Sequence, residues 1–150
     1  MQNPDDRRKL ALIIANDEYH QEQNRLTNCV SNARELSNKL KTINFKVTLA
    51  LNLRKHEMID EIIDFSKTIY DGDLVLFYFS GHGYQVDNKN YLIPVNDDSI
   101  ESDRDIEDFA TDAERIFSRL VKRNRSYVTV FILDCCRPYA LPSRSRASCK

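Results

Sequence analysis

Residues 74–83 read LVLFYFSGHG, and this stretch decides which fold the chain can adopt. Its first six residues, Leu74–Phe79, are all apolar or aromatic, which is typical of a β-strand that is covered on both faces. Two of the chain's three glycines then flank a single histidine, His82. The stretch therefore predicts a buried strand with a candidate site at its carboxyl end.

The rest of the chain predicts strands and helices that alternate around this stretch. Short apolar or alternating runs predict further strands at residues 9–15, 45–50 and 127–133. Apolar residues spaced three and four apart predict amphipathic helices over residues 28–43, 55–70 and 111–123. This order predicts an α/β fold, with a mostly parallel sheet flanked by helices on both faces.

A segment without a clear period separates the strand at 74–79 from the last helix. Residues 91–95 fit a small extra strand, whereas residues 96–108 carry seven carboxylates and one arginine. We expect residues 96–108 to form a solvated surface loop, with a substrate-side loop or a weak cation site as the alternatives. The segment lacks the glycine and the spacing of a calcium loop, so we predict no metal site.

Length and composition are those of a single soluble domain. The chain has 150 residues, of which 41% are hydrophobic and 30% charged. Its formal net charge of -1 argues against binding to nucleic acid or to a membrane surface, since both need a basic face. We expect an N-terminal tail over residues 1–8, a domain over 9–137, and a disordered C-terminal tail over 138–150.

The cysteines and the hydropathy pattern predict a reducing, cytoplasmic compartment. No apolar run approaches the roughly 20 residues that a membrane helix needs, and no signal peptide precedes Leu10. The cysteines show no C-x-x-C motif and no regular disulfide framework. They are Cys29, Cys135, Cys136 and Cys149. We expect free thiols.

Reactive side chains follow two of the predicted strands. His82 comes after the strand at 74–79, and Asp134-Cys135-Cys136-Arg137 comes after the last strand. Parallel neighbours would bring both strand ends to one edge of the sheet, where α/β proteins form their sites. Alone, His82 fits a turn histidine and each cysteine fits an inert buried thiol. Together they indicate a nucleophile with an acid–base partner. The N–H groups of Gly83 and Cys136 could stabilise the oxyanion of the tetrahedral intermediate.

Four motifs occur in a specific order. They are ALIIAND-x-Y at 11–19, FYFSGHGY at 77–84, NYLIPVN at 90–96 and LDCCR at 133–137. Cys136 lies 54 residues after His82, close to the spacing of about 50 that is known for caspases. From Lys9 to Arg137 the chain resembles the large-subunit region of the caspase–paracaspase–metacaspase superfamily, and it is most similar to paracaspases.

The resemblance implies a caspase-like fold and a cysteine endopeptidase that acts on protein or peptide substrates. A thiol–imidazole mechanism needs no cofactor. The superfamily's nucleophile directly precedes the residue that matches Arg137, which implies Cys136. His82 matches the catalytic histidine that protonates the leaving amine, and Cys135 would face the other way. Nucleotide and zinc sites have little support, because the phosphate-binding glycine motifs and the zinc-ligand spacings are missing from the sequence.

Asp134 suggests the substrate preference. Residues 134 and 136 are two apart, so their side chains share a face if the strand continues. A carboxylate there would select Arg or Lys at the P1 position, as in paracaspases and metacaspases; the alternative is that Asp134 caps a loop. Two residues depart from the paracaspase pattern: neutral Asn32 aligns with its second pocket acid, and Arg25 lies one position from the P1-binding arginine of caspases.

Superfamily members continue past the nucleophile into a small subunit that completes the sheet. This chain ends thirteen residues after Arg137, so we expect the small-subunit strands to be missing. A second hypothesis follows: a catalytically inactive caspase-like module that binds or regulates a caspase-like or adaptor protein partner.

Overall fold

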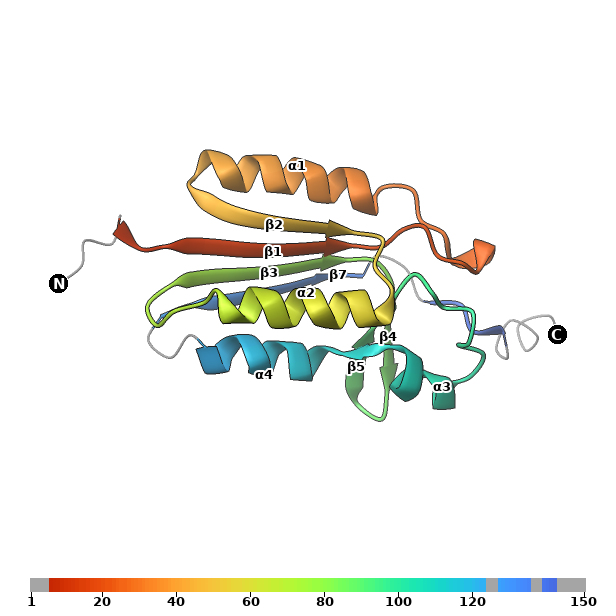
Figure 1. Ribbon diagram of the computed structural model, residues 1–150. Helices are drawn as coiled ribbons and strands as arrows, with labels where there is room; N and C mark the ends of the chain where they lie inside the picture. Colours follow the sequence, from red (N-terminus) through yellow and green to blue (C-terminus); the bar gives the residue numbers. More distant parts are fainter. Residues whose placement is uncertain (1–5, 124–126, 136–138, 143–150) are drawn as a thin grey trace.

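The computed structural model describes residues 6–123, 127–135 and 139–142. Its main sheet has four parallel strands in the order β2-β1-β3-β7 (Figure 1). The strands are β1 (Lys9–Ala15), β2 (Phe45–Leu51), β3 (Leu74–Ser80) and β7 (Thr129–Asp134). The predicted strands and the predicted α/β class are confirmed, and the apolar run at 74–79 forms an interior strand.

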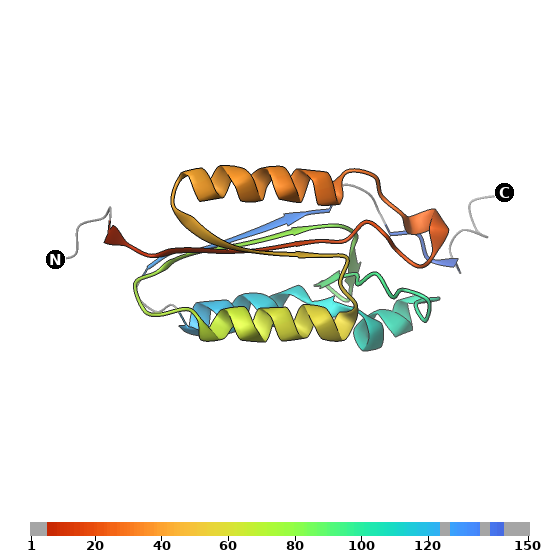
Figure 2. The same cartoon turned by 45° about the horizontal axis from the view of Figure 1, so that its top comes forward.

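Helices cover both faces of this sheet, as the sequence predicts. α1 lies on one face, and α2 and α4 lie together on the other (Figure 2). Their bounds are Cys29–Thr42 for α1, Lys55–Lys67 for α2 and Ala113–Arg123 for α4. These bounds agree with the predicted ranges to within two residues, except that α2 ends at Lys67 rather than at residue 70. In the described part of the chain, no helix is long and apolar enough to span a membrane.

Alternate residues of β1 and β3 supply the two halves of the core. Leu12 and Phe77 pack toward α2 and α4, whereas Ile13 packs toward α1, and all three are fully buried. Burial of one such side chain stabilises the fold by about 1.5–3 kcal/mol relative to its exposure. A strand with apolar residues at every position can satisfy both faces, which explains why β3 lies inside the sheet.

β7 is one of the two edge strands in the described part of this sheet, and β2 is the other. Val130, Ile132 and Leu133 are each more than one-third exposed on β7. The expectation that the small-subunit strands are missing concerns this edge, and it stays a prediction.

A small antiparallel sheet follows β3. It has the order β4-β5-β6, with β4 at Gly83–Val86, β5 at Lys89–Leu92 and β6 at Thr111–Asp112. Asp87 and Asn88 connect β4 to β5 with positive φ angles of 49° and 63°, as a tight hairpin turn requires. β5 takes the place of the extra strand that was predicted at 91–95, but it begins earlier, at Lys89, and ends at Leu92.

The predicted solvated loop at 96–108 is wrong in its second half. Residues Asp103–Phe109 form the helix α3, which begins with a capping box between Ser102 and Asp105. Ile106 of this helix and Ile100, which precedes it, are fully buried. Two isolated isoleucines among seven carboxylates leave no helical period in the sequence, so only the packing identifies the helix.

The predicted disordered tail also differs in the part that the structure describes. Tyr139 and Leu141 are buried in a cluster with Tyr19 and Ile93. Residues 1–5 and 143–150 of the two predicted tails lie outside the described residues.

The packing of α4 on the sheet can be tested with a pair of alanine variants. Leu120 is fully buried, so we expect Leu120→Ala to lower the free energy of unfolding by about 2–5 kcal/mol. Ser118 is exposed on the same helix, and Ser118→Ala should change that free energy by less than about 0.5 kcal/mol. Urea denaturation followed by circular dichroism measures both. Equal unfolding midpoints for the two variants would contradict the described packing.

Candidate active site

The pairing of β3 with β7 brings two loops to the same edge of the main sheet. Ser80 is paired with Asp134, and the Gly81 N–H donates to the Asp134 carbonyl at 3.3 Å. His82 therefore lies two residues beyond one end of this pair, and Cys136 two residues beyond the other. Cys136 and Arg137 lie outside the described residues, so the role assigned to Cys136 stays a prediction.

His82 is buried and its ring is held on several sides. Only 3% of the residue is exposed. Its Nε2 lies 2.7 Å from the Asn24 carbonyl oxygen, and its ring lies 4.8 Å from that of Tyr19 and 5.5 Å from that of Tyr139, centroid to centroid. Because a carbonyl oxygen can only accept, Nε2 carries the proton. In a neutral imidazole of this tautomer the lone pair is on Nδ1, which can then take up a proton.

The loop that provides the Asn24 carbonyl is tied to Asp97. Asp97 is fully buried and accepts hydrogen bonds from the Gln21 N–H at 2.9 Å, Asn24 Nδ2 at 3.2 Å and the Tyr139 hydroxyl at 2.9 Å. The Asn24 side chain also binds residue 140, since its Oδ1 accepts the Ala140 N–H at 3.2 Å. Burial, followed by the negative charge of Asp97, raises the pKa of Tyr139 above its usual value. This network joins three distant segments behind His82.

Tyr19 holds the other side of His82. Its hydroxyl accepts the His82 N–H at 2.8 Å and donates to the Ile93 carbonyl at 3.2 Å. Burial raises the pKa of the Tyr19 phenol, although the hydrogen bond from His82 works against this shift. A Cβ on Gly81 would lie 2.8 Å from both the Phe79 ring and the Tyr19 oxygen. Residue 81 must therefore be glycine for the chain to pass so close to Tyr19.

Asp134 and Cys135 point to different partners. The Asp134 carboxylate accepts the Tyr78 hydroxyl at 2.8 Å, on the face of the sheet that α1 covers. Cys135 is exposed. Its Sγ lies so close to Gly83 that a Cβ added at Gly83 would be 2.8 Å from this sulfur. The expectation that Cys135 faces the other way from Cys136 stays a prediction, because Cys136 lies outside the described residues. A pocket of about 370 Å³ lies beside Gly83 and Cys135.

The two departures from the paracaspase pattern lie near α1. Arg25 follows Asn24, and its Nε donates to the Tyr19 carbonyl at 2.9 Å. Asn32 is exposed on α1, three residues after Cys29, which is the first residue of this helix. Burial raises the pKa of the Cys29 thiol, and a hydrogen bond with Ser80 partly offsets this shift.

Sequence reasoning missed the residues that hold His82. Asp97 belongs to the segment that was predicted to be a solvated loop, and Tyr139 to the predicted tail. Tyr19 was noticed only as the last residue of the motif at 11–19, with no role assigned to it. Within residues 6–123, 127–135 and 139–142, no group of three or more His, Cys, Asp or Glu side chains is arranged to hold a metal ion.

The hydrogen bond between His82 and Tyr19 can be tested through stability. Tyr19→Phe keeps the ring but leaves the buried His82 N–H without its acceptor, so we expect a loss of about 1–3 kcal/mol in the free energy of unfolding. Tyr70 is exposed, and Tyr70→Phe should change that free energy by less than about 0.5 kcal/mol. Urea denaturation compares the two. A Tyr19→Phe variant as stable as Tyr70→Phe would rule out the described contact.

Comparisons with known proteins agree with this geometry. The mucosa-associated lymphoid tissue lymphoma translocation protein 1 of Homo sapiens and its Mus musculus homolog are each 28% identical over 130 residues, which cover 86% of this chain. The chain spans 15% of the length of these curated relatives. A crystal structure of a Geobacter sulfurreducens protein shares the fold, with a TM-score of 0.66 and 16% identity over 95% of this chain and 56% of that one.

A family comparison covers almost the whole chain. The model of the caspase domain, a family of cysteine peptidases, matches residues 8–148. This match includes every strand of the main sheet and both loops at its carboxyl edge. The chain therefore belongs to the caspase domain family.

Proposed function

We propose that this chain carries a caspase-like cysteine endopeptidase site, with Cys136 as the nucleophile and His82 as its acid–base partner. The observation that carries this proposal is the pairing of Ser80 with Asp134 in neighbouring parallel strands. Because of this pairing, the loops that carry His82 and Cys136 begin side by side, and each of these residues comes two positions after the paired residue of its strand. Loops that leave one edge of a sheet together can bring a thiol and an imidazole within reach of one peptide bond.

The proposed reaction uses the tautomer of His82. Nδ1 takes the proton of the Cys136 thiol, and the sulfur forms a bond to the carbonyl carbon of the scissile peptide. The carbon–nitrogen bond breaks as the imidazolium returns that proton to the leaving amine. Water then attacks the resulting thioester, which releases the acyl product as a carboxylic acid and restores the thiol. The Asn24 carbonyl stabilises the imidazolium through its hydrogen bond to Nε2.

The register of β4 supports Gly83 as an oxyanion donor. The Ile93 N–H donates to the His82 carbonyl at 2.9 Å, one position before the Gly83–Leu92 pair of the β4–β5 hairpin. Hydrogen-bonded and non-hydrogen-bonded pairs alternate in antiparallel sheets, so the Gly83 N–H points away from β5. In the proposed site this N–H and that of Cys136 stabilise the negative oxygen of the tetrahedral intermediate.

The proposed P1 preference is for Arg or Lys. Asp134 supplies a carboxylate next to the loop of Cys136, and the Tyr78 hydroxyl holds one of its oxygens. Arg25, the residue that would favour an acidic P1 side chain, already donates its Nε to the Tyr19 carbonyl. Asn32 adds no charge. The Asp134 carboxylate therefore gives the proposed pocket a negative charge.

The assignment of the nucleophile can be tested with a thiol-reactive peptidyl probe that carries Arg at P1. We expect the probe to label Cys136, as identified by mass spectrometry, and Cys136→Ala and His82→Ala to lower kcat/KM for a reporter peptide by about 10³-fold or more. Cys135→Ala is the matched control and should keep both labelling and hydrolysis.

Two outcomes would count against this assignment. Hydrolysis that survives Cys136→Ala or His82→Ala would refute the proposed pair of residues. A folded wild-type chain that neither reacts with the probe nor cleaves any reporter would instead favour the inactive binding module.

The P1 preference can be tested by removing one charge. Asp134→Asn keeps the acceptor for Tyr78, and we expect it to lower kcat/KM for Arg-P1 peptides by about 10- to 100-fold, because it removes a charge-assisted hydrogen bond. Asp64→Asn removes the same charge from an exposed position on α2 and should have no such effect. Arg-P1, Lys-P1 and Asp-P1 reporters are compared for each variant. Preferential cleavage after Asp by the wild-type chain would show that the preference is not basic.

A further inference from the structure

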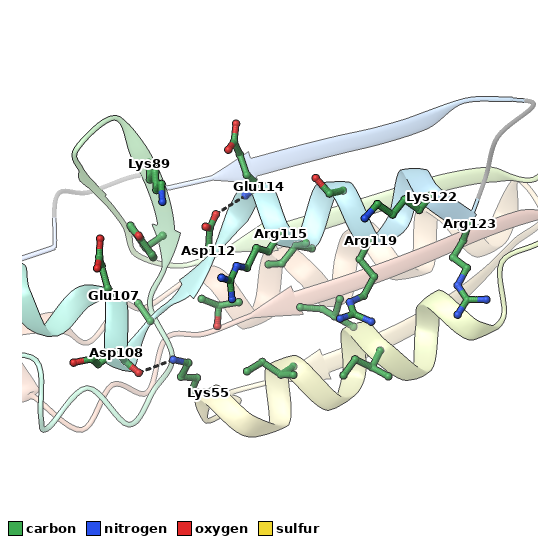
Figure 3. A pocket seen from close by; sticks show the side chains of 18 residues that line it. Lys55, Lys89, Glu107, Asp108, Asp112, Glu114, Arg115, Arg119, Lys122 and Arg123 are labelled. Carbon is green, nitrogen blue, oxygen red and sulfur yellow. Dashed lines mark hydrogen bonds between the residues drawn. The ribbon is translucent and has the colours of Figure 1, made fainter.

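A second surface feature lies on the face of the sheet opposite α1. α2 and α4 pack side by side there, and the groove between them and the β5–β6 end has a volume of about 950 Å³ (Figure 3). α2 contributes isoleucine side chains to its lining, namely Ile59, Ile62 and Ile63. α4 contributes four cations to the lining, namely Arg115, Arg119, Lys122 and Arg123.

Three of these cations form one row. Arg115, Arg119 and Arg123 are four residues apart and therefore lie on the same face of α4. Figure 3 shows their side chains directed toward α2. Within the part of the chain that the structure describes, none of these three arginines makes an ion pair shorter than 4.0 Å.

The floor of the groove is apolar. Ile59 is 37% exposed, Ile63 is half-buried and Ile62 is buried beneath them. The acidic residues of α2 lie outside the lining, namely Glu57, Asp60, Glu61 and Asp64. An apolar strip three and four residues apart, beside a row of unpaired arginines, is complementary to an amphipathic helix with an acidic flank.

The far end of the groove has the opposite charge. Glu107, Asp108, Asp112 and Glu114 line it near α3 and β6. Lys55 reaches across this end and donates to the Asp108 carbonyl, so its ammonium is already bound to the main chain. A nucleic acid would carry phosphates along the whole groove and would meet these carboxylates. A peptide can instead concentrate its own carboxylates at the arginine end.

We propose that this groove binds an acidic amphipathic peptide segment of a partner protein. The apolar side chains of the segment would contact Ile59 and Ile63, and its carboxylates would pair with Arg119 and Arg123. The site does not involve His82 or Cys136, so this inference goes beyond the protease proposal and does not depend on it. It would let the chain recruit a substrate or a regulator while the carboxyl edge of the sheet stays open.

Selection from a random 16-residue peptide library tests this proposal without a known partner. The full 150-residue chain is the target, and the folded Arg119→Glu/Arg123→Glu variant serves for counter-selection. We expect the enriched peptides to carry apolar residues three and four apart together with Asp or Glu. Enrichment of peptides without acidic residues, or failure to enrich any peptide that distinguishes the two proteins, would overturn the proposal.

Fluorescence anisotropy with one enriched, labelled peptide then measures separately how the arginines and Ile59 contribute to the affinity. We expect the dissociation constant to rise at least about tenfold for Arg119→Glu/Arg123→Glu and to rise clearly for Ile59→Asn, which removes the exposed apolar contact. Arg34→Glu/Lys41→Glu makes the same charge change at exposed positions of α1 and is the matched control.

Three results in this assay would contradict the inference. The first is an equal loss of affinity in the α1 control, and the second is affinity that does not depend on Ile59. The third is tighter binding of a labelled oligonucleotide that is lost in Arg119→Glu/Arg123→Glu but not in Ile59→Asn, which would make the groove a polyanion site.

Discussion

The parallel pairing of β3 with β7 is the constraint on which the rest of the structure depends. These strands are far apart in the sequence, and the segment between them contains the small sheet, α3 and α4. Their hydrogen bonds fix where the loops after Ser80 and Asp134 begin. The apolar residues of β3 keep this pairing in place, because they pack against both layers of helices. A site that draws on both loops is therefore only as precise as the register of these two strands.

Around His82 the protein gathers polar groups from several distant segments of the chain. The Asn24 carbonyl and the Tyr19 hydroxyl each hold one nitrogen of this residue, and Asp97 holds the loop of Asn24. A buried carboxylate is costly unless donors surround it, and two segments, residues 21–24 and Tyr139, supply donors to Asp97. The position of the imidazole is consequently determined by chain segments that carry no reactive group themselves.

The two faces of the sheet differ in what they leave exposed. α1 covers one face alone, and its outward surface is mixed in charge, as in the Glu35–Lys39 ion pair. On the other face α2 and α4 lie next to each other, and the groove between them is lined by isoleucines of α2 and arginines of α4. Helices that pack in pairs leave a groove between them, and its chemistry depends on residues that contribute little to the core.

The sequence by itself determined the layers of the fold and predicted where the site lies. Buried strands and amphipathic helices have periods that can be read locally, and the motifs around His82 and Cys136 indicated the family. Only the tertiary structure decided the roles of Asp97, Tyr139 and α3, because these depend on contacts between distant segments. A carboxylate or an isoleucine in an acidic stretch has the same local pattern whether it is buried or exposed. Its burial is decided by the partners that the rest of the chain brings to it.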